Sequence, residues 1–247
     1  GVALGSGTDA ARESSDIVIL NNSFSVIVEA IKQGRVIKDN IKKSLTYLLS
    51  TGFSEIILIG GSVIAGFPLP VLPAQILWAN IIQEGFMNFA YGFEKGERGV
   101  MNKENAGGRI FTRDVKVMIF VIGIITDIFL LILFFVLLKL DYDLGKIRTI
   151  MFVGLSFDAI FFALSLKSLK QPLWKINIFS NKYLICAWFL SLFALIAALT
   201  FSPLQNLLEL SPISINEFLI ILCLGILNLF SIEAAKFWLN RNKNNFN

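Results

Sequence analysis

The sequence predicts a mainly α membrane protein, a polytopic bundle of six transmembrane helices preceded by a short remnant of a soluble α/β domain. Of the 247 residues, 55% are hydrophobic, and the mean hydropathy is +0.70. Several nearly uncharged runs reach the roughly 20 residues that a helix needs to cross a bilayer. We therefore expect an integral membrane protein whose first partner is the lipid bilayer.

Composition excludes several kinds of chemistry. The chain contains no histidine, which rules out histidine metal sites and histidine acid–base catalysis within it. Cys186 and Cys223 lie in apolar runs without metal-ligand spacing, so we expect two buried structural thiols. The net charge of +4 is explained by cytosolic loops, and we expect no nucleic-acid partner.

Residues 1–43 differ from the rest because polar and apolar residues are mixed there. The run DIVIL at 16–20 is typical of a strand, and residues 25–49 carry apolar side chains at helical spacing. We expect residues 1–43 to form the edge of an α/β domain and a stalk helix. The transmembrane domain would cover 44–240, and 241–247 would be a cytosolic tail. The chain opens without an initiator Met, which indicates a fragment of a longer protein.

The membrane spans are separated by loops of contrasting charge. The loops at 93–116 and 167–182 are rich in Lys and Arg, whereas 67–72 is uncharged and 203–217 carries only acidic charges. The positive-inside rule therefore predicts that both termini are cytosolic; we expect a plasma-membrane protein. The spans are expected near 45–66, 73–92, 116–138, 148–166, 183–202 and 215–238. The cations of the first basic loop are Lys95, Arg98, Lys103, Arg109, Arg113 and Lys116.

The second span, PAQILWANIIQEGFMNFAYG, carries a polar stripe. Asn80, Gln83, Glu84 and Asn88 lie at i, i+3, i+4 and i+8, which is one face of a helix. A charged group in a span costs about 2.5–3.5 kcal/mol on insertion scales, so such residues indicate function. Gly85 would allow the helix to relax and free backbone carbonyls.

Three further carboxylates lie within predicted spans: Glu55, Asp127 and Asp158. Glu55, with Ser54 beside it, lies at a depth similar to that of the stripe if spans one and two form a hairpin. Carboxylate and amide oxygens suit a hard cation such as calcium or sodium, or a proton. The predicted cation-binding residues are Glu55, Asn80, Gln83, Glu84 and Asp158, with Ser54, Asn88 and Asp127 as secondary candidates and Glu55, Asn80 and Glu84 as the metal ligands.

A structural explanation remains open for some of these residues. A lone Asn or Gln can simply hydrogen-bond a neighbouring helix, and Asp127 lies mid-span without other strong polar neighbours. No catalytic residue is predicted. The glycine-rich start, GVALGSGTDA, has no Lys after its glycines and so lacks a complete phosphate-binding loop.

Residues 1–101 resemble the C-terminal part of a P-type cation-transporting ATPase of the calcium-pump and sodium-pump kind. GVALGSGTDAARESSDIVILNNSFSVIVEAIKQGR is similar to the end of that family's phosphorylation domain, a soluble HAD-like α/β fold. IKKSLTYLLSTGFSE is similar to the entry into its fifth transmembrane helix, and LPAQILWANIIQEGFMNFAYGFEKGERGVM to its sixth helix. Residues 115–247 supply four further hydrophobic spans, as this resemblance implies.

The resemblance places the family's fifth-helix glutamate at Glu55, its sixth-helix asparagine at Asn80 and its sixth-helix aspartate at Glu84. Asp158 falls in the eighth helix, which also contributes a polar ligand. The sequence departs from the family where Gly52 replaces an Asn and Met87 a Pro. The common Thr-Asp-Gly is Gln-Glu-Gly at 83–85, which would suit a single ion or a proton relay.

The resemblance implies an ATP-driven cation pump that uses ATP and Mg²⁺ at sites outside this fragment, in the rest of the ATPase chain. Calcium is the ion most favoured, with sodium, potassium or a proton as alternatives. The aspartate that ATP phosphorylates and the fourth helix would lie upstream of Gly1. Two rival interpretations are an ATP-independent secondary transporter or channel with a midplane carboxylate site, and a membrane scaffold whose last two spans are anchors.

Overall fold

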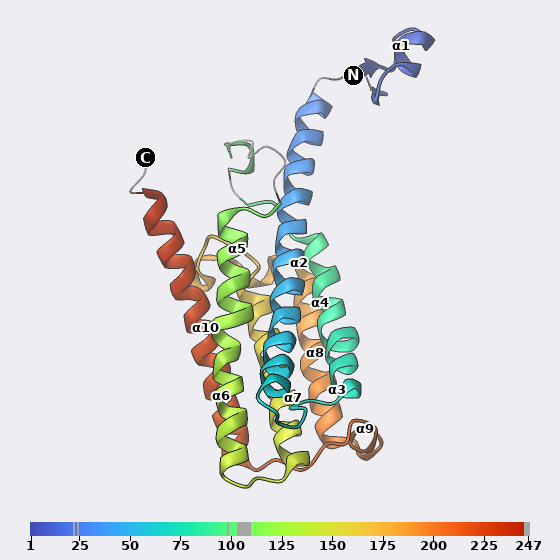
Figure 1. Ribbon diagram of the computed structural model, residues 1–247. Coiled ribbons are helices and arrows are strands. Elements are labelled where there is room, and N and C mark those ends of the chain that lie inside the picture. The colour runs from blue at the N-terminus through green and yellow to red at the C-terminus, as the bar shows by residue number, and fades with distance from the viewer. Residues whose placement is uncertain (22, 24, 98, 103–109, 245–247) are drawn as a thin grey trace. The chain divides into compact units, whose positions relative to one another are not determined.

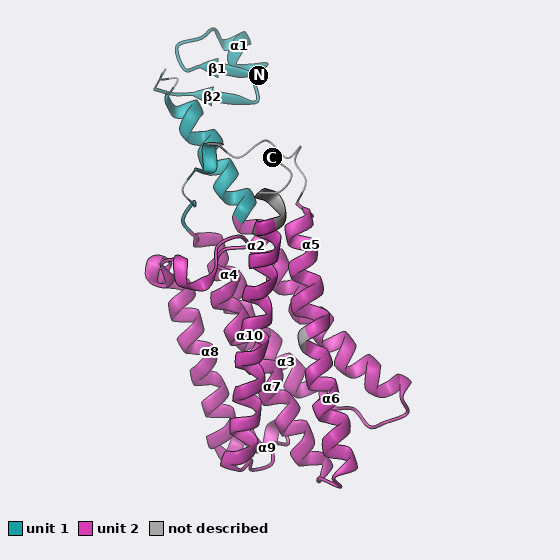
Figure 2. Ribbon diagram, turned by 90° about the vertical axis from the view of Figure 1, so that its left-hand side faces the viewer, with its two compact units in different colours: residues 1–39, 95–108 teal, residues 40–94, 109–247 magenta. Residues whose placement is uncertain are grey.

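The computed structural model describes residues 1–247 except 22, 24, 98, 103–109 and 245–247, and it confirms a mainly α fold. Figure 1 shows the long helices running side by side. The predicted loop cations Arg98, Lys103 and Arg109 lie outside the described residues. The chain divides into two compact units, 1–39 with 95–108 and 40–94 with 109–247, drawn in teal and magenta in Figure 2.

The first unit contains a small β-α-β element. Strand β1 (Val2–Leu4) pairs in parallel with β2 (Ile17–Ile19), and α1 (Asp9–Glu13) lies between them in the chain. The strand predicted from DIVIL is confirmed as β2, whereas β1 and α1 come from the glycine-rich segment that carried no strand or helix signal. A parallel pair joined through a helix is the connection expected of an α/β domain.

Helix α2 (Ser25–Ile64) is a single 40-residue helix. The predicted stalk therefore runs into the first predicted span without interruption. Its buried residues are mostly small or polar, among them Thr51 and Ser54. Large apolar side chains such as Phe53 and Ile56 are exposed, which is the pattern expected where a helix turns its apolar face to lipid.

The second predicted span is helical but irregular. It consists of α3 (Pro73–Trp78), the π-helix η1 (Ala79–Glu84) and α4 (Gly85–Ala90), followed by the 3₁₀ turn η2 (Tyr91–Phe93). The π-helix occupies the polar stretch and ends at Glu84. Single π turns are rare and recur at functional sites.

The remaining spans match the predicted positions closely. They are α5 (Arg113–Phe120), η4 (Val121–Ile125, a second π turn) and α6 (Thr126–Lys139) in one run, then α7 (Leu144–Ser165), α8 (Lys182–Thr200) and α10 (Ile215–Asn244). Besides α1 and η2, the described residues outside these spans form the short helices η3 (Val100–Asn102), η5 (Leu173–Lys175), η6 (Ile178–Ser180) and α9 (Ser202–Leu207).

By length and composition, five helices in the described part of the chain could cross a membrane. They correspond to five of the six predicted spans. The sixth, at 73–92, is absent from that set because three consecutive six-residue elements replace one long helix.

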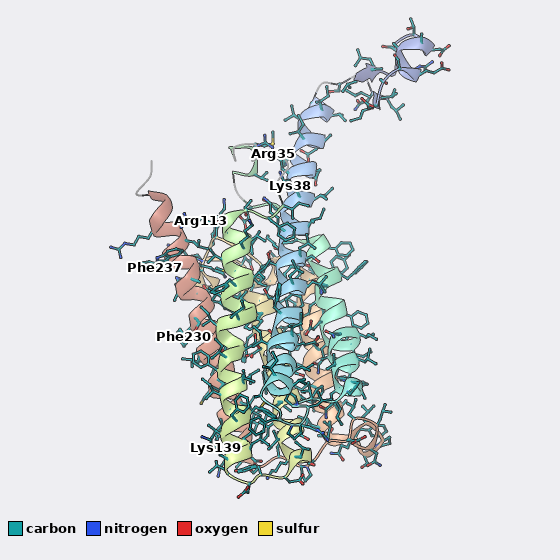
Figure 3. All side chains as sticks on the ribbon, viewed as in Figure 1. Arg35, Lys38, Arg113, Lys139, Phe230 and Phe237 are labelled. Atoms are coloured by element: carbon teal, nitrogen blue, oxygen red, sulfur yellow. The ribbon has the colours of Figure 1, made fainter. Side chains whose placement is uncertain are left out.

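Helix α7 is the central helix of the second unit. It packs against α6, α8, α10 and η1. Of the most apolar 18-residue stretch of α7, 78% is buried, against 28–41% of the corresponding stretches in the other four candidate spans. The outer helices expose apolar side chains instead. Figure 3 shows Phe230 and Phe237 projecting outward from α10, and Arg113 and Lys139 at opposite ends of the α5–α6 run. Such a band of apolar side chains is what a bilayer requires.

The prediction that both cysteines are buried is wrong. Cys186 in α8 and Cys223 in α10 are exposed. Both belong to outer helices, where an apolar residue is as well placed against lipid as against protein, so hydrophobicity of the run does not predict burial.

Candidate cation site

A small cavity lies between α2, η1 and α7 within the second unit. The space open to the centre of a water-sized sphere is about 10 Å³, which is room for about one water molecule. Its polar lining comes from three helices that are distant in the sequence. The residues around it are Thr51, Ser54, Glu55, Ala79, Glu84, Leu155, Asp158, Ala159 and Phe162.

Helix α2 supplies one wall. Asn80 of η1 donates its Nδ2 hydrogen to Glu55 Oε1 at 2.9 Å, so these two predicted ligands are in direct contact. Ser54 Oγ donates to Asp127 Oδ2 at 2.5 Å, which places Asp127 one hydrogen bond behind the cavity wall. Asp127 is fully buried.

The close approach of the two helices that carry Ser54 and Asp127 depends on a glycine. A Cβ at Gly123 in η4 would lie 2.9 Å from the carbonyl oxygen of Ser50 and 2.9 Å from Cβ of Phe53. Only glycine therefore allows α2 and η4 to pack at this separation, which brings Ser54 within hydrogen-bonding distance of Asp127.

The π-helix supplies the second wall. Glu84 faces the cavity and is 6% exposed. The preceding residue, Gln83, is fully buried, and its carbonyl oxygen accepts a 2.6 Å hydrogen bond from Ser191 Oγ of α8. This hydrogen bond ties α8 to the end of the π turn.

Asp158 of α7 supplies the third wall. It is 3% exposed, and its Oδ1 accepts a hydrogen bond from Asn228 Nδ2 of α10 at 2.8 Å. Glu84 lies close enough to Glu55 and Asp127 for their charges to interact, and Asp158 is likewise close to Asp127. Four carboxylates therefore gather in one region of the bundle, and their mutual repulsion favours a neutralising cation or proton.

Several buried polar atoms in this region have no hydrogen-bond partner among the described residues. They are Asp158 Oδ2, Asn228 Oδ1 and both side-chain polar atoms of Gln83. Three of these four atoms are acceptor oxygens. A buried acceptor without a donor is costly, and a hard cation that binds oxygen ligands would remove that cost.

The carboxylates do not form a complete metal site as they stand. Within the described residues, no group of three or more Asp, Glu, Cys or His side chains is arranged closely enough to hold a metal ion. A hard cation binds six to eight oxygens when it is calcium-like. Further oxygens must therefore come from amides, hydroxyls, carbonyls, water or another part of a longer chain.

The predicted residues fall into three groups by position. Ser54, Glu55, Glu84 and Asp158 line the cavity, and Asn80 and Asp127 each contact a lining residue. Gln83 is buried beside Glu84 without lining the cavity, and Asn88 lies farther along α4, where Ser44 Oγ is 3.3 Å from its Oδ1. The predicted single stripe assumed α-helical geometry, and the π turn at Ala79–Glu84 interrupts that geometry.

Three polar residues at the site were not predicted from the sequence: Thr51, Ser191 and Asn228. Ser191 and Asn228 belong to the last two spans, which carry no mid-span carboxylate. A single Ser or Asn in an apolar run gives little signal, although Asn228 is the only amide side chain between positions 217 and 239.

Comparison with known proteins assigns the chain to a family. The family described as "Cation transporting ATPase, C-terminus" matches residues 68–238, more than two thirds of the chain. The chain belongs to this cation-transporting ATPase family. The predicted resemblance to the C-terminal part of a P-type cation-transporting ATPase is therefore confirmed.

Curated members of the cation-transporting ATPase family are similar over nearly the whole chain. Calcium-transporting ATPase 1 of Bacillus cereus is 31% identical over 96% of this chain, and calcium-transporting ATPase of Bacillus subtilis is 29% identical over 95%. Calcium-transporting ATPase type 2C member 1 of Homo sapiens is 31% identical over 90%. The chain spans 29%, 27% and 24% of the lengths of these three relatives.

Proposed function

We propose that this chain is the C-terminal membrane domain of an ATP-driven calcium pump, in which Glu55, Asn80, Glu84 and Asp158 supply oxygen ligands to the transported ion. Gln83 is a further ligand once its buried amide turns toward the ion. The observation that carries the proposal is the cavity between α2, η1 and α7, because three of these four side chains line it.

Calcium is supported by the relatives and by the ligand chemistry. The printed names of the similar curated proteins describe calcium transport by those proteins. The lining offers carboxylate and hydroxyl oxygens and no thiolate or imidazole, which is the donor set that calcium prefers. Membership of an ATPase family favours a pump over the ATP-independent transporter or channel that the sequence left open.

The residues of this cavity supply only part of the oxygen ligands that a calcium ion needs. The resemblance implies that the family's fourth helix, upstream of Gly1, adds ligands to the same site. Ser54, Asn88 and Asp127 are secondary candidates, and of these Ser54 is best placed because it lines the cavity, with Asp127 one hydrogen bond behind it. Closure of the complete set around a dehydrated calcium ion would neutralise Glu55 and Glu84.

Helix α2 is the element that couples the site to ATP. It is continuous from Ser25 to Ile64 and carries Glu55 on the same rod as the stalk. In this proposal, phosphorylation and its Mg²⁺ chemistry belong to the rest of the ATPase chain, and a tilt of the stalk would move Glu55 relative to Glu84. We further propose a plasma-membrane location with both termini in the cytosol.

The test is calcium-dependent ATP hydrolysis by the complete pump in membrane vesicles. Glu84→Gln keeps the size of the side chain and removes its charge, so we expect the calcium concentration for half-maximal activity to rise about 100-fold or more, the equivalent of about 2.7 kcal/mol. Parallel assays test sodium, potassium or manganese in place of calcium, each over a range of pH. Stimulation by one of these other cations alone would refute calcium as the cargo.

The matched control is Glu209→Gln, which makes the same change at an exposed position in the loop before α10. It should leave calcium activation unchanged. Unaltered calcium affinity in Glu84→Gln would refute the assignment of this cavity as the transport site.

A further inference from the structure

The buried pair formed by Asp158 and Asn228 points to a role for the last helix. Asp158 Oδ1 is held by the Asn228 amide at 2.8 Å, while Asp158 Oδ2 has no partner among the described residues. Asp158 lines the cavity and Asn228 does not. The asparagine therefore reaches the cavity through the carboxylate that it binds.

We propose that Asn228 of α10 is a positioning residue for the cation site, which fixes the Asp158 carboxylate so that Oδ2 remains available to the ion. This inference rests on the proposed function, because it assumes that Asp158 is a ligand. It adds α10 to the helices that determine calcium affinity, although α10 contributes no cavity-lining residue.

The packing of α10 on α7 supports this role. A Cβ at Gly225, one turn before Asn228, would lie 2.8 Å from Cε2 of Phe161 on α7. The glycine therefore lets the two helices approach closely enough for an Asn side chain to reach Asp158. Ile221 and Ile232 are buried on the same face of α10, so this face is packed and Asn228 is held at a defined depth.

The chemistry of the pair explains why an amide is suited to this position. A Lys or Arg at this position would neutralise Asp158 and compete with a transported cation. Lys236 neutralises Glu233 in this way elsewhere on α10. An apolar residue would leave the carboxylate free to rotate and both of its oxygens without a donor. The Asn amide donates one hydrogen bond and adds no charge, so Asp158 keeps its affinity for a cation.

The experiment is a double-mutant cycle in the complete pump, read as the calcium concentration for half-maximal ATPase activity and, separately, as maximal activity. The variants are Asn228→Leu, which keeps the approximate volume and removes the donor, Asp158→Asn and the double change. We expect Asn228→Leu to raise the half-maximal calcium concentration roughly 10-fold, the equivalent of about 1.4 kcal/mol, because the variant loses a hydrogen bond to a charged group. Maximal activity should be retained.

Non-additivity is the decisive result. If Asn228 acts through Asp158, adding Asn228→Leu to Asp158→Asn should raise the half-maximal calcium concentration no further. Independent, multiplicative effects would overturn the inference, as would a loss confined to maximal activity or to the amount of folded protein. Ser231→Ala, at a half-buried position of the same helix where the hydroxyl bonds the Leu227 carbonyl one turn earlier, should match the unmodified protein.

The same cycle separates failure of this inference from failure of the proposed function. Unchanged calcium affinity in Asp158→Asn would remove Asp158 from the transport site, and the proposed ligand set would fail with it. Reduced affinity in Asp158→Asn together with unchanged affinity in Asn228→Leu would leave the ligand set intact and refute only the role of Asn228.

Discussion

Two sets of buried charged residues in the second unit differ in how completely the protein satisfies them. Near the end of α7 that carries Ser165, Glu94 accepts hydrogen bonds from Lys167 at 2.5 Å and from Asn181 at 3.0 Å. Glu233 is also paired, with Lys236 at 2.8 Å. In the cavity, by contrast, the ion pairs of the described residues do not involve Glu55, Glu84 or Asp158.

The difference separates carboxylates that the protein itself neutralises from those without an ion pair among the described residues. Glu94 joins the end of the second predicted span to the loop after α7 and, through Asn181, to the start of α8. Its charge is neutralised within the protein, so it holds helices together and has no need of a ligand. Glu84 and Asp158 are as deeply buried as Glu94, and Glu55 is half-buried, but the ion pairs of the described residues involve none of the three. This is why we propose that a guest cation or proton supplies the missing charge.

The largest expected effect comes from breaking a satisfied pair. Lys167→Met would leave Glu94 buried without its counter-charge and should lower the free energy of unfolding by about 3–5 kcal/mol. Thermal unfolding of the detergent-solubilised protein measures the loss. Lys175→Met makes the same change at an exposed position and should have little effect. Equal melting temperatures for the two variants would contradict a structural role for the pair.

Unlike Lys167→Met, Glu84→Gln should not destabilise the protein when calcium is absent. Because the ion pairs of the described residues do not involve Glu84, loss of its charge should leave the melting temperature unchanged or raise it. The unmodified pump should gain about 2.7 kcal/mol at a calcium concentration 100 times the dissociation constant. The variant should lose that gain. A lower melting temperature of the variant without calcium would show that the Glu84 charge stabilises the fold, as that of Glu94 does.

Gly123→Ala tests whether helix packing positions the cavity wall. The added Cβ would meet α2 at 2.9 Å, so α2 and η4 must separate, at a cost of about 1–3 kcal/mol in unfolding free energy. Separation should also weaken the Ser54–Asp127 contact and reduce calcium affinity. Gly60→Ala, on α2 with open space around the new Cβ, is the control. Similar melting temperatures for both variants would argue against close packing at Gly123.

The smallest expected effect is that of Ser191→Ala. Loss of the hydroxyl removes the hydrogen bond that Ser191 donates to the Gln83 carbonyl of the π turn, at a cost of about 1 kcal/mol, typical of hydrogen bonds between membrane helices. A calcium affinity lowered a few-fold, measured by calcium-dependent ATPase activity, would show that the π turn positions Glu84. Thr200→Val, at an exposed position on α8, should not change the affinity. An unchanged affinity in Ser191→Ala would separate the π turn from ion binding.

Much of this molecule follows from its sequence. Long apolar runs predict the membrane helices because bilayer thickness sets their length. The carboxylates within those runs, Glu55, Glu84, Asp127 and Asp158, are predicted as candidate site residues because burying them is costly. The continuity of stalk and first span could also be predicted, since no proline interrupts residues 25–64.

Tertiary structure decided which of these groups meet and which remain unsatisfied. A lone Asn228 or Ser191 in an apolar span carries no sequence signal for its partner, because the partner lies on another helix and the pairing depends on helix rotation and depth. The π turn at Ala79–Glu84 likewise depends on packing against α7 and α8. Local sequence determines that a helix forms and how polar it is, whereas only the packed bundle determines which polar atoms find partners.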